Sequence, residues 1–278
     1  MYIDLHVHTT FSDGSFTPEE VVIYAKSKDL AGIAITDHDT IDGNMEALNT
    51  GKKEGIEVVQ GVEISVEHKG GTMHILGYFI DLTDKGLITF LEKLQNGRQE
   101  RNFQILKQLN NLGIEITYEE VLERSCGAQL GRPHFASIMV EKGYVESHKD
   151  AFNRYLKKGG PAYAERARYY PKDAINVLRE AGGIPVLAHP FTLNTRTQQE
   201  LRAVVKKLAH FGLMGIEVYS PDHTTKQTEN YLRVAEQFGL VVTGGTDFHG
   251  ANKENVDLGS LMVPYRYLEM LKALKTVK

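Results

Sequence analysis

The sequence predicts an α/β fold, a closed or nearly closed barrel of strands and helices that carries one helical insertion. Short runs rich in Val and Ile alternate with amphipathic helical patterns, as is typical of a parallel sheet with helical crossovers. The candidate strands are residues 2–7, 32–36, 57–61, 73–79, 184–188, 215–219 and 240–243. Seven strands over 278 residues fit a (β/α) barrel better than an open sheet.

Helix start signals support this alternation. The sequence Thr17-Pro18-Glu19-Glu20 is a capping box with proline at the first helical position, so it predicts a helix that runs to about Lys28. Further helical patterns cover about 41–54, 197–211, 224–238 and 264–275. Each of them follows a candidate strand, as a crossover helix does.

The segment 85–169 departs from this pattern because it shows almost no strand signal. Its helical patterns run over 85–112, from the capping box of Thr117 and Glu120, from Gly131 to about Lys142, and near 147–158. We therefore expect a barrel domain made of 1–84 and 170–278, and a helical insertion at 85–169. Insertions over a barrel mouth usually shape substrate specificity.

Composition and charge exclude several classes of protein. Hydrophobic residues make up 41% and charged residues 24%, as in an ordinary globular protein rather than a disordered or fibrous one. The net charge of −4 provides no basic field for long duplex nucleic acid. A single cysteine, Cys126, permits no intrachain disulfide. Because no signal peptide or membrane-spanning run is apparent, we expect a cytoplasmic protein that does not bind membranes.

The sequence contains 11 histidines, and several of them fall, together with carboxylates, where candidate strands end. His6 and His8 close the first strand, and both imidazoles should point the same way because alternate residues of a strand share a face. The candidate metal ligands are His6, His8, Asp13, His38, Glu63, His74, His189, Asp247 and His249. Active sites of α/β barrels lie at the carboxyl ends of the strands, so these side chains should converge there.

This set of donors favours a site for several divalent cations. Imidazole and carboxylate together suit Zn²⁺, Mn²⁺ or Fe²⁺, and so many donors exceed the needs of one ion. They suit two or three ions, with a carboxylate such as Glu63 as a bridge. Clustered divalent ions lower the pKa of a bound water, so that hydroxide forms at neutral pH, and they neutralise phosphoryl oxygens. The sequence therefore predicts hydrolysis of a phosphate ester.

Several motifs carry a resemblance to a known family. They are Asp4-Leu5-His6-Val7-His8-Thr9, Ser12-Asp13-Gly14, Thr36-Asp37-His38-Asp39, Ala188-His189-Pro190 and Thr246-Asp247-Phe248-His249, with Glu63 and His74 between them. Together they resemble the PHP (polymerase and histidinol phosphatase) family, from residue 2 to about residue 260. The resemblance implies a distorted seven-stranded (β/α) barrel with a trinuclear metal centre. It implies one ion on His6, His8, Glu63 and Asp247, a second on Asp13, His38 and His249, and a third on Glu63, His74 and His189.

A second group of motifs narrows this resemblance. They are Gly131-Arg132-Pro133-His134, Pro161-Ala162-Tyr163, Ala181-Gly182-Gly183 and Ser220-Pro221-Asp222-His223-Thr224. They resemble those of small metal-dependent PHP phosphoesterases, which remove the 3′-phosphate of 3′,5′-bisphosphonucleotides or trim short RNA from its 5′ end. The resemblance implies a small phosphorylated substrate, a nucleotide or short oligonucleotide, and three divalent ions per chain, with Mn²⁺ favoured over Zn²⁺ or Fe²⁺.

Basic residues outside the ligand set are candidates for contact with the substrate. Arg132 could hold a phosphate with a bidentate fork, and His134 or His223 could protonate or stabilise the leaving oxygen. Arg166 and Arg168 could bind a second phosphate. Three other functions stay open at this point: a histidinol-phosphate phosphatase, a non-catalytic metal-binding barrel and an amide-cleaving amidohydrolase.

Overall fold

The computed structural model describes residues 1–125, 130–165, 169–253 and 255–276. The chain divides into two compact units, of which unit 1 comprises Met1–Leu91 and Tyr169–Lys278, and unit 2 comprises Glu92–Arg168. The long helix α3 (Lys85–Asn111) begins in unit 1 and continues into unit 2. Unit 1 is therefore formed by two segments of the chain, which the helical unit 2 separates in sequence.

Unit 1 is built on an eight-stranded sheet with the order β7-β6-β5-β4-β3-β2-β1-β8. The strands are β1 (Tyr2–Val7), β2 (Leu30–Ile35), β3 (Glu57–Val66), β4 (Met73–Tyr78), β5 (Ile184–Leu187), β6 (Gly215–Tyr219), β7 (Val241–Gly244) and β8 (Val263–Pro264). The first seven correspond to the predicted strands, and the α/β class is confirmed. The count of seven is wrong by one, because β8 has only two residues, which is too short for a strand pattern in the sequence.

The strands are not all parallel, which corrects the prediction. β1, β2 and β3 are parallel, as are β5, β6 and β7, but β4 runs antiparallel to both of its neighbours. Only residues 67–72 connect β3 to β4, and a connection of that length has no room for a crossover helix. The chain therefore turns back on itself as a hairpin. β8 is also antiparallel to its neighbour, β1.

The segment that follows β7, at one end of the strand order, pairs with the end of β1, which lies next to the last strand at the other end. Val7 forms an isolated parallel bridge with Phe248, in the segment that follows β7. The His8 N–H donates to the carbonyl of Phe248 at 2.9 Å. The Phe248 N–H donates in turn to the carbonyl of His6 at 3.2 Å. These bonds bring the sheet almost to closure, so the predicted nearly closed barrel is confirmed.

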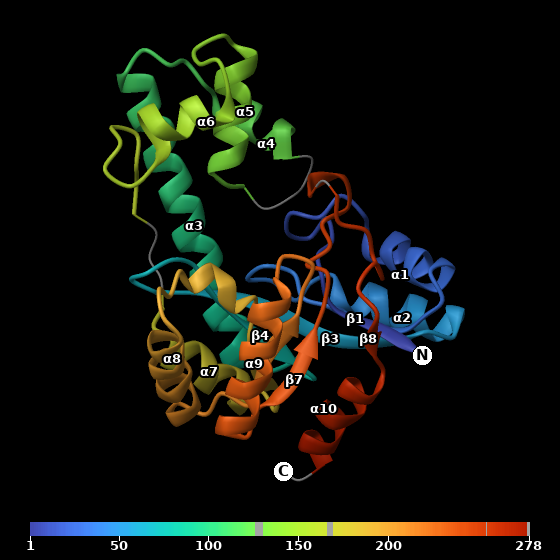
Figure 1. Cartoon of the computed structure of the whole chain (residues 1–278). Coiled ribbons are helices and arrows are strands. Elements are labelled where there is room, and N and C mark those ends of the chain that lie inside the picture. Colours follow the sequence, from blue (N-terminus) through green and yellow to red (C-terminus); the bar gives the residue numbers. More distant parts are fainter. Residues whose placement is uncertain (126–129, 166–168, 254, 277–278) are drawn as a thin grey trace. The chain divides into compact units, whose positions relative to one another are not determined.

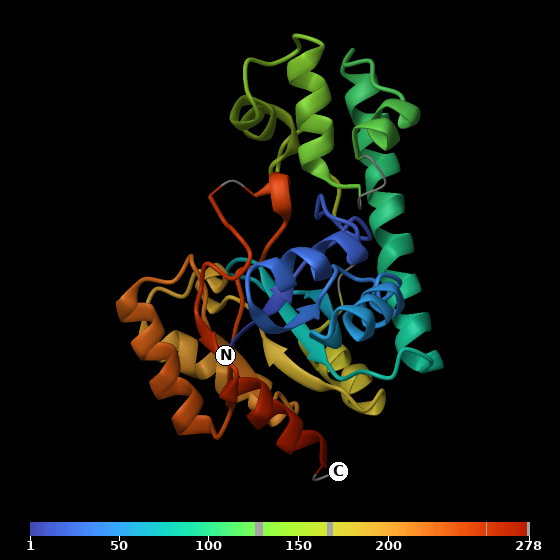
Figure 2. The ribbon, with the colours of Figure 1, turned by 90° about the vertical axis from the view of Figure 1, so that its right-hand side faces the viewer.

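Helices flank the sheet of unit 1. They are α1 (Pro18–Ser27), α2 (Asn44–Glu54), α7 (Pro171–Glu180), α8 (Gln198–His210), α9 (Thr225–Phe238) and α10 (Arg266–Thr276), with the 3-10 turns η2 (Pro190–Leu193) and η3 (Gly250–Asn252). α1 and α2 lie on the right-hand side of Figure 1, the side that faces the viewer in Figure 2. Val21 and Val22 of α1 join Ile33 and Ile35 of β2 in one buried apolar cluster. This cluster fixes α1 against the strands that carry the first ligands.

The sequence signals predicted the start of α1 correctly but did not lead to a prediction of α7. The Thr17 hydroxyl accepts from the Glu20 N–H at 3.2 Å, and the Glu20 carboxylate accepts from the Thr17 N–H at 2.8 Å. The capping box at the start of α1 is therefore confirmed. The helix α7 was not predicted, although proline opens it and Ile175 and Leu178 give it a buried apolar face.

Unit 2 is helical in its described part, which contains no strand. Besides its share of α3 it contains α4 (Tyr118–Ser125), α5 (Arg132–Glu141), α6 (His148–Ala151) and the π-helical turn η1 (Phe152–Leu156). Its own apolar cluster includes Ile105 and Leu109 of α3 and Phe135 and Met139 of α5. Among the helices described in either unit, none is long and apolar enough to cross a membrane.

Candidate metal centre

The nine predicted ligands of unit 1 come together at one edge of its sheet. His6 lies in β1, Glu63 in β3 and His74 in β4, and the other six follow β1, β2, β5 or β7. His74 lies near the start of its strand rather than at the end. Because β4 is antiparallel to β3, its start pairs with the end of β3, where His74 lies opposite Ser65. The reversed strand therefore brings His74 to the same edge as the others.

Glu63 is fully buried and has five imidazoles around its carboxylate. Its Oε1 lies 2.8 Å from Nδ1 of His74 and 2.9 Å from Nε2 of His189. Its Oε2 lies 2.9 Å from Nδ1 of His38, 3.3 Å from Nε2 of His8 and 3.4 Å from Nε2 of His6. The two oxygens face different imidazoles, so this carboxylate could be shared by two cations.

Asp247 and Asp13 bring further carboxylate oxygens to the cluster. Asp247 Oδ1 lies 3.3 Å from Nε2 of His6 and 3.1 Å from Nε2 of His8. Asp13 Oδ1 lies 3.2 Å from Nε2 of His249. Three overlapping groups have all their ligand atoms within 4.8 Å of one another: His6, His8, Glu63 and Asp247; His8, Asp13, His38 and His249; and His38, Glu63 and His74.

Several atoms of the cluster are buried without a hydrogen bond to any described residue. They are Nε2 of His6, Nε2 of His8, Oδ1 of Asp13 and Oε2 of Glu63. A buried polar atom without a partner costs about 1–3 kcal/mol, so such atoms rarely gather in one place without a ligand. Divalent cations bind imidazole nitrogen and carboxylate oxygen at about 2.0–2.2 Å and would satisfy all of them. The residues present therefore fit a divalent metal centre.

Glu217 orients two of the histidines, and the sequence analysis missed it. It is buried in β6, with Oε1 at 3.0 Å from Nδ1 of His6, while Oε2 accepts from the His189 N–H at 2.7 Å. Because a carboxylate accepts, His6 Nδ1 carries a proton, which leaves Nε2 as the nitrogen that would bind a cation. The available signal was an acidic residue inside the apolar strand Gly-Ile-Glu-Val-Tyr.

Asp37 fixes the loop that carries Asp13. Its carboxylate accepts from the Thr9 N–H at 2.7 Å and from the Ser12 hydroxyl at 2.6 Å. Asp37, Thr9 and Ser12 are fully buried, whereas the Asp13 side chain is 39% exposed. The buried carboxylate of Asp37 therefore gives a partly exposed ligand a fixed place.

Two of the predicted ligands have strained backbones. Asp247 has a φ of 54° and His189 a φ of 23°, values that non-glycine residues rarely adopt and that cost about 1–3 kcal/mol each. Next to Asp247, the N–H and hydroxyl of Thr246 donate to the buried carboxylate of Asp4 at 2.9 and 2.6 Å. These hydrogen bonds hold the segment in a conformation that aims Asp247 into the cluster.

The cluster shifts the pKa values of its own members. Burial raises the pKa of Glu63, but the surrounding imidazoles outweigh burial and hold that pKa well below its usual range. Burial lowers the pKa of His8, but the carboxylates of Asp247 and Glu63 outweigh it and raise the pKa to about 10. For His74 burial dominates, and the pKa falls to about 4. Before any cation binds, His8 is therefore protonated at neutral pH, whereas His74 is neutral.

Binding of Mn²⁺ at pH 7 is expected to release at least one proton, because His8 must lose its proton to become a ligand. His74 has no proton to lose. At lower pH more of the His8 side chain is protonated and cannot bind a cation. The apparent affinity for Mn²⁺ should therefore increase as the pH rises, by about tenfold per pH unit for each proton released, up to about pH 10. Calorimetric titrations in two buffers of different ionisation enthalpy measure the released protons. Equal heats in both buffers would contradict the assignment of His8 as a ligand.

Arg132, a predicted phosphate contact, lies in unit 2 at the start of α5. Its Nη1 donates to the carbonyl of Leu156 at 3.1 Å. Its guanidinium also lies 5.7 Å from the ring centroid of Phe152 and 5.9 Å from that of Tyr163. These contacts fix the guanidinium within unit 2, and binding of phosphate by Arg132 stays a prediction.

His134 has a local role that the sequence analysis did not separate from a catalytic one. Its Nδ1 accepts from the Gly131 N–H at 3.0 Å, which satisfies a backbone donor at the start of α5. With Nδ1 as the acceptor, a neutral ring carries its proton on Nε2. Arg166 and Arg168 lie outside the described residues. For all three residues, contact with the substrate stays a prediction.

His223 lies in unit 1, in the loop that follows β6. Its Nδ1 donates to the carbonyl of Val218 at 2.8 Å, and its ring contacts those of Phe191 and Tyr231. Phe191 also contacts the predicted ligand His189, at 6.2 Å between ring centroids. Nε2 of His223 is buried and has no hydrogen-bond partner among the described residues. Burial lowers the pKa of His223, so the neutral ring offers Nε2 as an acceptor.

Residues 4–170 match the PHP domain family. The chain is 34% identical to a 3′,5′-nucleoside bisphosphate phosphatase of Chromobacterium violaceum, over 92% of this chain and 90% of that protein. It is also 34% identical to a 5′-3′ exoribonuclease of Haemophilus influenzae, over 88% of this chain and 89% of that protein. These relatives align along almost their whole length, so the similarity extends well beyond the matched domain.

Solved structures agree with the sequence matches. A Bifidobacterium adolescentis protein assigned to the metal-dependent phosphoesterases superposes with a TM-score of 0.83 at 28% identity, over 98% of this chain and 95% of that one. A Chromobacterium violaceum protein described as an amidohydrolase gives 0.81 at 31% identity, over 98% and 96%. The chain therefore belongs to the PHP domain family, in which it is a metal-dependent hydrolase of phosphate ester bonds.

Proposed function

We propose that this chain hydrolyses a phosphate ester of a nucleotide or of the 5′ end of a short RNA. The observation that carries the proposal is the convergence of nine imidazole and carboxylate side chains on one buried space. Two relatives support the substrate class, since one is named for nucleoside bisphosphates and the other for an exoribonuclease activity. Both names involve a phosphate ester on a nucleoside or on RNA.

Three divalent cations account best for the number of donors. We assign one to His6, His8, Glu63 and Asp247, a second to Asp13, His38 and His249, and a third to Glu63, His74 and His189. The short distances from Glu63 Oε1 to His74 and His189 support the third position. Mn²⁺ is the ion that we favour, with Zn²⁺ or Fe²⁺ as alternatives, and the nitrogen and oxygen donors of a set without thiolate suit all three.

The chain's own residues hold and orient this centre. Bound divalent cations would supply a water of lowered pKa and neutralise charge on the phosphoryl oxygens. Glu217 keeps the Nε2 lone pair of His6 directed into the cluster. Burial of Glu63, His6 and His8 excludes bulk water from that side, which strengthens every electrostatic interaction there.

We assign His223 to substrate binding rather than to protonation of the leaving oxygen. Its Nδ1 already donates to Val218, so in the neutral ring Nε2 is an acceptor that suits a hydroxyl or amino group of the substrate. The predicted acid role would need a protonated ring, which burial disfavours. In unit 2, Arg132, Arg166 and Arg168 are proposed as phosphate contacts, and His134 is proposed to protonate or stabilise the leaving oxygen. Unit 2 is also proposed to set the substrate range.

Manganese-loaded protein is expected to release phosphate from adenosine 3′,5′-bisphosphate and to shorten 5′-phosphorylated RNA trimers, both faster than it hydrolyses histidinol phosphate. Initial rates over a panel of phosphate esters and amides, with chelator-treated protein as the control, measure this preference. Faster turnover of histidinol phosphate would overturn the substrate class. Turnover of amides alone would favour the amidohydrolase activity for which one structural relative is named. No turnover of any substrate would favour a non-catalytic barrel.

A further inference from the structure

The segment that follows the ligand His249 is held in one place beside the centre. The Ala251 N–H donates to the Ser15 hydroxyl at 2.8 Å. Gly250 has a φ of 62°, and a Cβ at this position would collide with the same hydroxyl. Only glycine therefore allows this close approach. The fold fixes the position of Lys253, which ends the turn, before any substrate binds.

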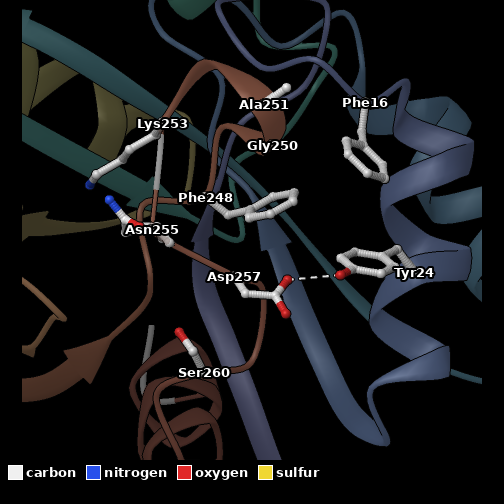
Figure 3. Close-up of a pocket in the computed structure, with 10 residues that line it drawn as sticks. Phe16, Tyr24, Phe248, Gly250, Ala251, Lys253, Asn255, Asp257 and Ser260 are labelled. Carbon is white, nitrogen blue, oxygen red and sulfur yellow. Dashed lines mark hydrogen bonds between the residues drawn. The ribbon is translucent and has the colours of Figure 1, made fainter.

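Lys253 reaches from this turn toward the metal centre. It lines a pocket of about 700 Å³, but Figure 3 shows its side chain pointing away from the rings of Phe16 and Tyr24 on the other side of that pocket. Its Nζ donates to Oδ2 of Asp247 at 2.9 Å and to Oδ2 of Asp222 at 3.1 Å. The side chain is 25% exposed, so the ammonium group is held but not sealed off.

The carboxylate of Asp247 divides its two oxygens between the ligand cluster and this lysine. Oδ1 faces Nε2 of His6 and Nε2 of His8, at 3.3 and 3.1 Å. Oδ2 accepts from Lys253. The carboxylate of Asp247 therefore lies between the Lys253 ammonium and the imidazoles of His6 and His8.

The ammonium has bonding capacity that the chain does not use. It has three N–H donors, and the described part of the chain supplies acceptors for two of them. A phosphate bound at the cluster would bring several strong acceptor oxygens to this place. Lysine suits such an oxygen because its compact charge needs no bidentate geometry. Two carboxylates already hold the ammonium, so little further ordering is needed when the third acceptor arrives.

We propose that Lys253 binds a phosphoryl oxygen of the substrate and adds a positive charge from the protein to the metal centre. The inference rests on the proposed function, because it requires a phosphate ester at the cluster. The competing role is purely structural, in which the two ion pairs only join the loop of Asp222 to Asp247.

Inorganic phosphate is the probe that separates these roles. Its dissociation constant from manganese-loaded protein, measured by calorimetry, should rise about 10- to 100-fold in Lys253→Met, as expected for a lost charge-assisted hydrogen bond. The KM for a phosphate ester should rise with it, and metal content should stay unchanged. Lys253→Arg keeps the charge and should lose less. Lys28→Met is the matched control, because it removes a similar lysine–aspartate pair, to Asp257 at 2.7 Å. It should bind phosphate as the wild type does.

Two outcomes overturn the inference. The first is an unchanged phosphate affinity in Lys253→Met. The second is loss of metal from Lys253→Met by elemental analysis, since the lysine would then act through Asp247 instead of through the substrate. A wild-type protein that neither binds phosphate nor hydrolyses any phosphate ester would contradict the proposed function itself, and the inference would fail with it.

Discussion

Glu63→Gln is expected to abolish hydrolysis of phosphate esters and to leave the fold in place. Glutamine keeps the size of the side chain but loses the charge that faces five imidazoles at 2.8 to 3.4 Å. A neutral amide cannot bridge two divalent cations as a carboxylate does. Metal ions supply several kcal/mol of transition-state stabilisation, so kcat should fall by about 1,000-fold or more. Elemental analysis should show a lower metal content.

The matched control for this variant is Glu57→Gln on the same strand. The Glu57 carboxylate accepts from the Tyr265 hydroxyl and from Lys272, both at 2.7 Å. Neither partner is one of the nine predicted metal ligands. This variant should keep its metal and its turnover. Circular dichroism and thermal unfolding of both variants check the fold. Near-wild-type turnover in Glu63→Gln would count directly against a shared carboxylate at the centre.

Glu217→Gln is expected to weaken Mn²⁺ binding by about 10- to 100-fold, the usual effect of removing a hydrogen bond that orients a metal ligand. Both oxygens of Glu217 accept, one from His6 and one from the His189 N–H. Glutamine has only one acceptor, and its NH₂ group would face one of these two donors. His6 is then free to adopt the other tautomer, in which Nε2 carries the proton and cannot bind a cation.

Glu217→Ala separates this effect from stability. It leaves two buried donors without an acceptor, and each should lower the free energy of unfolding by about 1–3 kcal/mol. Glu217→Gln should lose affinity with a smaller loss of stability. Calorimetric Mn²⁺ titration and chemical unfolding measure the two quantities, with the exposed Glu236→Gln as the control. Unchanged Mn²⁺ affinity in Glu217→Gln would mean that Glu217 only packs the interior.

The elements that the sequence predicted well are those with local signals. The capping boxes at Thr17 and Thr117 and the Val- and Ile-rich runs gave the first seven strands and most helices. The direction of β4 was missed because a strand's residues look the same in either direction, and only the short connection 67–72 distinguishes a hairpin from a crossover. The strand β8 has two residues and owes its existence to pairing with β1.

The residues of the candidate site also differ in whether a local sequence signal marks them. Candidate ligands such as His6, Glu63 and His189 could be predicted because each lies at or near the end of a predicted strand, where position in the sequence indicates position in space. Glu217 was missed because its role depends on a contact with His6, 211 residues away. Lys253 was missed because its importance depends on which carboxylates it meets after the η3 turn. Contacts of this kind arise from tertiary packing. A local pattern can mark an acidic residue inside an apolar strand, as at Glu217, but it does not show which side chain that residue meets.

Anomalous diffraction from crystals of the protein grown or soaked with Mn²⁺ tests the metal centre most directly. The account predicts three anomalous peaks around the Glu63 carboxylate, one within each assigned ligand group, with His6, His74 and His249 each beside a different peak. Absence of any peak there at saturating Mn²⁺, with these side chains still in place, would contradict the existence of the centre.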